Sequence, residues 1–221
     1  MTAVNWYLSV DGVIVLTDTL LVTAEGKAAA FVQKVHSLAH LDALVSGRGD
    51  AALISDWVAM ASQRLLARDF DMLSELAPAL IRKIHGRLPV DRTAAWPGTT
   101  TIFMWGWSNR AERFTGYRYK SKQDFERQPL EPIGIAPGFE DECEQIKAAL
   151  AGDQVALGLC GALRQQHLES RRQAEKAVGG EAMMATLTRA AAGHVATECV
   201  RLFRFPDYDE DYAEALDLMN I

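Results

Sequence analysis

Cysteine is scarce in this 221-residue chain, and the three residues Cys143, Cys160 and Cys199 lie far apart without forming a Cys-x-x-Cys pair. An odd number of dispersed cysteines is typical of buried thiols in a reducing compartment rather than of disulfides or zinc ligands. The chain also lacks any run of about 18 apolar residues, and its start has no charged segment followed by a continuous apolar stretch. We therefore expect no membrane span, no signal peptide, no membrane partner and a cytoplasmic location.

An excess of positive charge is also missing, because the formal net charge is -6 and the lysines and arginines are scattered. Binding to a phosphate backbone requires a concentrated basic face, so nucleic acid is not an expected partner. Apolar residues make up 49% of the chain and charged residues 24%, which is the balance of an ordinary globular protein. Without internal repeats or low-complexity segments, the sequence predicts a single domain over residues 1–221.

The pattern along the chain alternates between blocks of strands and pairs of helices. Expected strands, several of them separated by Gly or Pro turns such as Asp11-Gly12, cover residues 3–10, 13–16, 20–22, 32–38, 41–45, 99–107, 113–121, 129–135, 182–187 and 194–205. Apolar residues at helical spacing predict helices at 50–67, 71–85, 139–151 and 155–176, and the acidic segment 207–217 is expected to form a solvated terminal helix. Pro78 lies inside the second helix and is expected to kink or divide it.

Segregated runs of strands and helices predict an α+β fold with a largely antiparallel sheet and a helical layer on each outer face.

Thr2 would become the first residue if Met1 were removed, which is common when the second residue is small. A threonine hydroxyl needs a base, and an N-terminal threonine carries one in its own α-amine, whose ordinary pKa is about 7.7 to 8.0. A neighbouring ammonium would lower that pKa and keep the amine neutral, and a carboxylate would hold the ammonium in place. Lys34 and Asp18 could supply these two groups.

The spacing of these residues resembles that of proteasome β-subunits and of their bacterial ring-forming peptidase relatives, which are N-terminal-nucleophile (Ntn) hydrolases. Asp18 lies sixteen positions after Thr2, and Lys34 lies sixteen positions after Asp18. The surrounding segments match as well, namely Thr17-Asp18-Thr19, Gln33-Lys34-Val35 and the turn Ser46-Gly47-Arg48-Gly49-Asp50. The resemblance implies a four-layer αββα sandwich with two largely antiparallel sheets between helical layers.

The same resemblance implies a threonine-type amide hydrolase, a peptidase that needs no cofactor or metal, acts on a peptide or other amide substrate and assembles into a homo-oligomer. The oxyanion would be supported by the amide of Gly47 or Arg48. The first specificity pocket would be lined by Leu21, Val32, His36, Ser46, Asp50 and Ile54, with a preference for polar or basic side chains. His36 and His40, four residues apart in a strand and turn pattern, do not predict a metal site.

The chain departs from this pattern at two hydroxyl groups that surround the nucleophile in active members. Ile135 stands where the family has the serine of a Gly-Ser-Gly turn, and Val178 stands where it has the serine of an Asp-x-x-Ser-Gly-Gly segment. If Met1 also stayed attached, Thr2 would contribute an amide nitrogen, which cannot act as a base. The alternative interpretation is a catalytically silent Ntn-fold protein that serves as an assembly or binding module.

Overall fold

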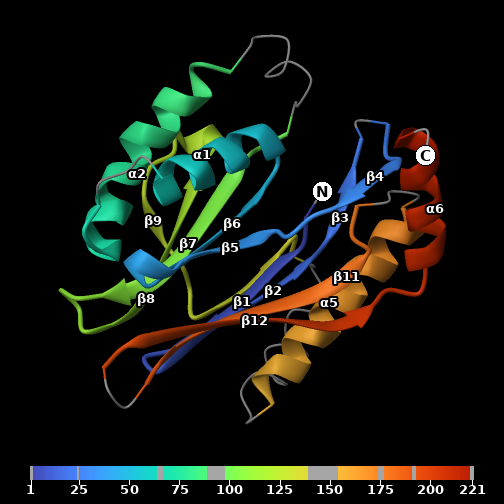
Figure 1. Cartoon of the computed structure of the whole chain (residues 1–221). Helices are drawn as coiled ribbons and strands as arrows, with labels where there is room; N and C mark the ends of the chain where they lie inside the picture. Colours follow the sequence, from blue (N-terminus) through green and yellow to red (C-terminus); the bar gives the residue numbers. More distant parts are fainter. Residues whose placement is uncertain are drawn as a thin grey trace.

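The computed structural model describes residues 2–23, 25–63, 67–88, 98–138, 154–173, 177–190 and 193–219 (Figure 1). The strands are β1 (Val4–Leu8), β2 (Gly12–Asp18), β3 (Leu20–Val22), β4 (Ala28–Phe31), β5 (Val35–Leu38), β6 (Ala43–Arg48), β7 (Thr101–Ser108), β8 (Arg113–Lys120), β9 (Gln128–Pro129), β10 (Ile133–Ala136), β11 (Glu181–Arg189) and β12 (Val195–Arg204). The helices are α1 (Ala51–Gln63), α2 (Phe70–His85), α5 (Val155–Arg172) and α6 (Tyr208–Met219), with 3-10 turns η1 (Ala39–Leu41) and η2 (Ser121–Gln123).

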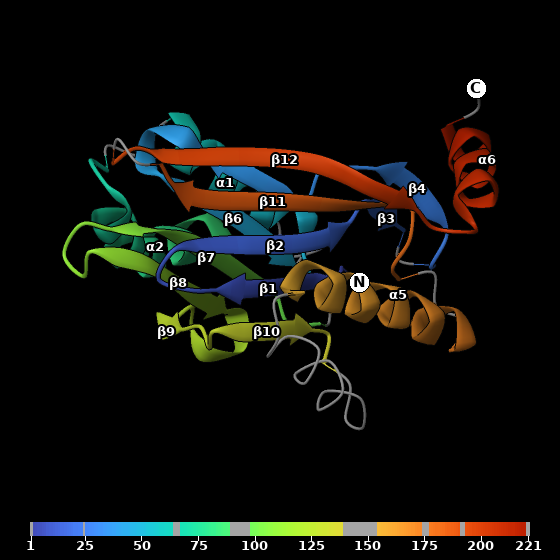
Figure 2. The same ribbon diagram turned by 90° about the horizontal axis from the view of Figure 1, so that it is seen from below.

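Antiparallel pairing organises these strands into sheets, as the sequence predicted. One five-stranded sheet has the order β10-β1-β2-β11-β12 (Figure 2), and a second has the order β5-β6-β7-β8-β9. Strands β3 and β4 form a separate two-stranded sheet. The fold is therefore a mixture of helices and antiparallel sheets.

The hairpin of β1 and β2 fixes the place of Asp18. The hydroxyl of Ser9 accepts hydrogen bonds from the amides of Asp11 (3.2 Å) and Gly12 (3.1 Å), which closes the expected turn. The register then pairs Val4 with Thr17, so Asp18 ends β2 directly beside the start of the chain.

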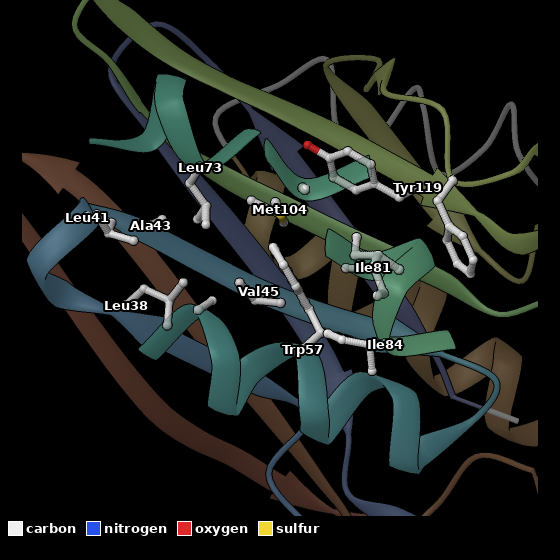
Figure 3. Packing of buried hydrophobic residues seen from close by; sticks show 14 of the residues in the cluster. Leu38, Leu41, Ala43, Val45, Trp57, Leu73, Ile81, Ile84, Met104 and Tyr119 are labelled. Carbon is white, nitrogen blue, oxygen red and sulfur yellow. The ribbon is translucent and has the colours of Figure 1, made fainter. Parts of the chain in front are cut away.

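The second sheet is buried on both faces because its side chains alternate between two apolar layers. Along β7, Ile102 and Met104 face α1 and α2 and contribute to the cluster drawn in Figure 3, together with Trp57 and Ile81. The remaining members of that cluster include Leu38, Leu41, Ala43, Val45, Leu73, Ile84 and Tyr119.

The opposite face of β7 packs against the first sheet. Phe103 and Trp105 point toward Trp6 of β1, with ring centroids 5.3 Å and 6.0 Å from that of Trp6. Trp6 and Trp105 are buried core residues, in agreement with the sequence, and Trp107 is half-buried.

Helix α5 covers the other face of the first sheet. Its residues Leu159 and Leu163 form a third apolar cluster with Leu16, Val178 and Phe205. Figure 2 shows α5 running across β1 and β2, and these two strands thus carry apolar residues on both faces.

Helix α2 is continuous through Pro78, so the proline does not divide the helix. A proline in a helix cannot donate to the carbonyl four residues earlier, which here belongs to Ser74. The hydroxyl of Tyr119 donates to that carbonyl at 3.1 Å and replaces the missing partner. The contact between β8 and α2 therefore allows the helix to keep a proline in its interior.

Two strand predictions were wrong. The segment Ala28–Phe31 was not among the expected strands but forms β4, because β3 pairs with it. The single expected strand at 129–135 is two strands, β9 and β10, which join different sheets. Pro132 lies between them and has no amide hydrogen to continue a ladder.

The acidic C-terminal helix was expected to be solvated, but part of it is buried. Asp211 of α6 is completely buried and Arg171 Nη2 donates to it at 2.6 Å.

Cys160 is half-buried, whereas Cys199 is exposed, so the expectation of a buried thiol fails for Cys199. Cys143 and the helix expected at 139–151 lie outside the described residues. In the described part of the chain, none of the helices combines the length and the apolar character that crossing a bilayer requires.

Candidate active site

Asp18 is the centre of a buried polar cluster. Its Oδ1 accepts a hydrogen bond from the amide of Ala3 at 3.0 Å, and its Oδ2 accepts from Lys34 Nζ at 2.9 Å and from the amide of Gly179 at 3.2 Å. Asp18 itself is completely buried. One carboxylate thus gathers the start of the chain, the lysine that the sequence singled out, and the glycine turn before β11.

Lys34 is held in this cluster by two acceptors. Besides Asp18, its ammonium donates to the carbonyl of Leu20 at 2.6 Å, and the residue is only 7% exposed. Burial lowers the pKa of Lys34 and the positive charge of Arg48 adds to this effect, whereas Asp18 opposes it. Lowering the pKa of a lysine brings it closer to neutral pH, where acid-base chemistry is most effective.

Thr2 is placed next to this ion pair by the hydrogen bond of its neighbour Ala3. The residue is half-buried. Met1 lies outside the described residues.

Gly47 and Arg48, the expected oxyanion residues, are the last two residues of β6 and face opposite sides of the sheet. A Cβ atom at Gly47 would lie 2.7 Å from side-chain atoms of Ile54, so a larger residue would have to displace the Ile54 side chain. Gly49 follows with φ of +106° and turns the chain into α1. Burial lowers the pKa of Arg48, and the charge of Asp18 opposes that change.

The residues expected to form the first specificity pocket differ in what they contact. Ser46 is fully buried and its hydroxyl donates to the carbonyl of Lys34 at 2.7 Å, which ties β6 to Lys34. Asp50 caps α1, because its Oδ1 accepts from the amides of Ala52 (2.8 Å) and Leu53 (3.1 Å). One oxygen of the Asp50 carboxylate therefore serves as the helix cap, and its place in a specificity pocket stays a prediction.

The other expected pocket residues are Leu21 on β3, Val32 just after β4, His36 on β5 and Ile54 on α1. Ile54 packs against Gly47. Burial lowers the pKa of His36, so the imidazole is neutral at physiological pH. No group of three or more His, Cys, Asp or Glu side chains within the described ranges is arranged to hold a metal ion.

The two positions without the expected serines are structured differently from each other. Val178 is buried in the apolar cluster under α5, and its carbonyl lies 2.8 Å from Nδ1 of His167. Ile135 lies on β10, opposite Asn5 of β1. Neither side chain offers a hydroxyl, yet the amide of Gly179, which follows Val178, still reaches Asp18.

Sequence reasoning missed a buried amide pair beside the start of β1. Asn5 Nδ2 donates to Gln166 Oε1 at 2.8 Å, and Gln166 Nε2 donates to Asn5 Oδ1 at 3.1 Å and to the carbonyl of Pro137 at 2.9 Å. This pair fixes β1 to α5 and to the end of β10. An asparagine inside an otherwise apolar strand was the available signal, because asparagine is a poor strand former.

A second group missed from the sequence supports the Gly179 turn. Arg171 lies 2.9 Å from Asp207 and 2.6 Å from Asp211, and His167 lies 3.6 Å from Asp207. The Arg171–Asp211 ion pair joins α5 to α6 and packs against Gly179, whose amide reaches Asp18. Its two residues lie about 40 residues apart in sequence, so no local pattern could pair them.

Comparison with solved structures identifies this arrangement of sheets and helices. The chain superimposes on Anbu, an ancestral β-subunit, from Yersinia bercovieri with a TM-score of 0.65 and 12% identity, covering 100% of this chain and 94% of that chain. For a mutant of Anbu from Hyphomicrobium sp. strain MC1 the TM-score is 0.63 at 15% identity, covering 99% and 93%.

The chain has the Ntn-hydrolase fold of proteasome-like β-subunits. The resemblance found in the sequence is confirmed at the level of fold. No protein-family model matches the sequence, and no curated protein matches it. The likeness thus rests on three-dimensional structure, and activity has to be argued from the residues of this chain.

Proposed function

We propose that this chain is a threonine-type amide hydrolase acting on peptides, with Thr2 as the nucleophile once Met1 has been removed. The observation that supports it is the carboxylate of Asp18, which binds Lys34 at 2.9 Å and the amide next to Thr2 at 3.0 Å. A buried lysine is a costly feature for a fold to keep, and here it lies beside the one residue that could be an N-terminal nucleophile.

In the proposed reaction, the Thr2 hydroxyl attacks the carbonyl carbon of the scissile amide and its proton moves to the Thr2 α-amine. The amine passes this proton to the leaving nitrogen as the C–N bond breaks, which leaves an ester on Thr2. Water then attacks the ester, gives its proton to the α-amine, and the proton returns to the Thr2 oxygen as the acid product leaves. Lys34 keeps the α-amine neutral, Asp18 anchors Lys34, and the amide of Gly47 or Arg48 would stabilise the oxyanion.

We further propose that residues 1–221 form one domain with the four-layer αββα arrangement. The three apolar clusters, one under α1 and α2, one between the five-stranded sheets and one under α5, support this layering. The described Anbu neighbour is named as a β-subunit, which supports the proposal that this chain also assembles with copies of itself.

A catalytically silent assembly or binding module is the second candidate. The observation that favours it is the absence of a hydroxyl at both Ile135 and Val178, since support around a nucleophile sets its geometry. The intact mass of the protein from its native host separates the two candidates. Retained Met1 leaves no free amine at Thr2 and contradicts the hydrolase.

If Met1 is removed, an electrophilic peptide probe tests the nucleophile. The wild-type protein and Thr2→Ser should be labelled, whereas Thr2→Ala should not, and Thr23→Ala serves as a threonine control that keeps labelling. Equal labelling of Thr2→Ala and wild type rules out Thr2 as nucleophile. Absence of labelling in a wild-type protein with a proven free Thr2 amine supports the silent module.

A further inference from the structure

A cavity of about 620 Å³ opens at the ends of β6, β7 and β8, next to the end of β10. Four of its lining side chains carry positive charge, and these are Arg48, Arg118, Lys120 and Lys122. No aspartate or glutamate stands among its described lining residues. The chain as a whole has a net charge of -6, so this group of four cations is a local region of opposite charge.

The register of the second sheet explains why these cations meet. Thr101 of β7 pairs with Arg48 on one side and with Lys120 on the other, so the three side chains project from the same face of the sheet. Arg118, two residues before Lys120, shares that face. It is the face that packs against the first sheet, and the aromatic core of Trp6 and Phe103 ends where the cations begin.

None of these four positive groups forms a close ion pair with an Asp or Glu of the described residues. Arg118 Nε donates to the neutral Gln128 side chain at 3.1 Å. Arg48 Nε is buried and has no hydrogen-bond acceptor in the described part of the protein. Burial and the nearby Arg118 both lower the pKa of Lys120. Like charges gathered in one place repel one another, and an anion bound among them would relieve that repulsion.

Arg48 connects the cavity to the candidate catalytic centre. Ser46, two residues before Arg48 on the same face of β6, donates a hydrogen bond to the carbonyl of Lys34 at 2.7 Å, and the charge of Arg48 helps to lower the pKa of Lys34. A group bound at Arg48 would therefore belong to the same substrate that reaches Thr2. On a peptide substrate the anionic group is a carboxylate, and a guanidinium binds carboxylates through two parallel hydrogen bonds.

We infer that the cavity lined by Arg48, Arg118, Lys120 and Lys122 binds a carboxylate of the substrate, so that the enzyme selects acidic peptides. This inference rests on the hydrolase proposed above, because that proposal makes the ligand a peptide. The carboxylate belongs either to an acidic side chain within the peptide or to its free C-terminus. Both sources have the same chemistry and are separated by the choice of peptide.

Binding can be measured without turnover in the Thr2→Ala variant by fluorescence anisotropy. The probes are a labelled Ala-Glu-Ala-Glu-Ala peptide with a C-terminal amide, its Gln counterpart, and a labelled Ala-Ala-Ala-Ala-Ala peptide with either a free carboxylate or an amide. We expect the Glu peptide, the free-carboxylate peptide or both to bind at least about tenfold more tightly than the matching neutral peptide. This preference should weaken as salt is raised.

The variant Lys120→Gln/Lys122→Gln changes two side chains that reach solvent and should weaken binding of the acidic probe about tenfold or more, with unchanged thermal unfolding. Arg113→Gln removes an exposed cation from the other end of β8 and is the matched control, expected to bind as tightly as the parent. Equal affinity for acidic and neutral peptides overturns the inference. An equal loss in Arg113→Gln also overturns it, because it would indicate general attraction to the surface.

These outcomes are independent of catalysis. Probe labelling at Thr2 with no preference for carboxylates would leave the hydrolase standing and remove the cavity assignment. Selective binding of acidic peptides without any labelling would keep the cavity as a binding site and contradict the hydrolase.

Discussion

Removing the Asp18 carboxylate should destabilise the fold strongly, because it leaves Lys34 as a buried charge without a counter-ion. Asp18 is completely buried and Lys34 is 7% exposed, so water cannot replace the lost partner. Breaking a buried pair from one side costs about 3–5 kcal/mol. The amides of Ala3 and Gly179 also lose their acceptor. For a chain of this size the lost free energy corresponds to a fall in Tm of about 6–20 °C.

The assay is urea unfolding of Asp18→Ala, Lys34→Met and the double variant, monitored by tryptophan fluorescence. The double variant no longer buries a charge and should be more stable than Asp18→Ala alone. The cycle should therefore give an interaction energy of about 1–3 kcal/mol between the two positions. Lys34→Met also leaves a buried charge, that of Asp18, so both single variants should be destabilised and the double variant should lose less than the sum of the two.

Glu75→Ala is the matched control for this cycle. Glu75 forms an ion pair with Arg110 at 2.8 Å, but both side chains are largely exposed, so its removal should have a far smaller effect. If Asp18→Ala is no less stable than Glu75→Ala, or if the effects at positions 18 and 34 simply add, the buried ion pair is not the cause and the reasoning is wrong.

Two further predictions concern pH and helix α2. Burial lowers the pKa of Lys34 below its ordinary value of 10.5, so the unfolded chain binds more protons than the folded chain between the folded pKa and 10.5. The free energy of unfolding, relative to that of Lys34→Met, should therefore rise with pH in that window. Urea titrations of both proteins from pH 7 upward would contradict this if the difference stayed flat or fell. Tyr119→Phe should lower the free energy of unfolding by about 1–3 kcal/mol, because the Ser74 carbonyl loses its donor. In a Pro78→Ala background, where the backbone amide returns, the same substitution should cost less, and equal costs in both backgrounds would refute the role given to Tyr119.

The local part of the fold follows from the sequence because its signals are local. The Asp11-Gly12 turn predicts the first hairpin, and that hairpin brings Asp18 to the start of the chain. Apolar spacing predicts α1 and α2 to within a few residues. Spacing also singled out Lys34, whose distance to Asp18 confirms that the two side chains pair.

The parts that sequence reasoning missed depend on contacts between distant segments. β4 is a run of alanines with little strand preference, and it is held by β3 and by α6, whose Glu214 accepts from the amide of Ala28 at 2.7 Å. The cationic cavity could not be predicted from the sequence either, because β7 lies between the strands of Arg48 and Lys120 and brings the two residues together.

Asp50 shows why a residue matched by position can have another use. Its place after the Ser46 turn suggested a pocket wall, but the free amides at the start of α1 need an acceptor and the Asp50 carboxylate supplies it. The cap occupies one carboxylate oxygen, and the match by position in the sequence did not predict this use.

Stability and chemistry are coupled in this chain through a single carboxylate. Asp18 receives hydrogen bonds from the start of β1, from Lys34 and from Gly179, and the turn at Gly179 is flanked by the ion pairs of Arg171. Replacing Lys34 alone by an apolar residue would leave the Asp18 carboxylate as a buried charge and destabilise the fold, so the pair has a structural role as well as a candidate chemical one. Loss of Lys34 would therefore affect stability and any chemistry at Thr2 together, and labelling of Thr2 in a variant with unchanged unfolding is what separates the two roles.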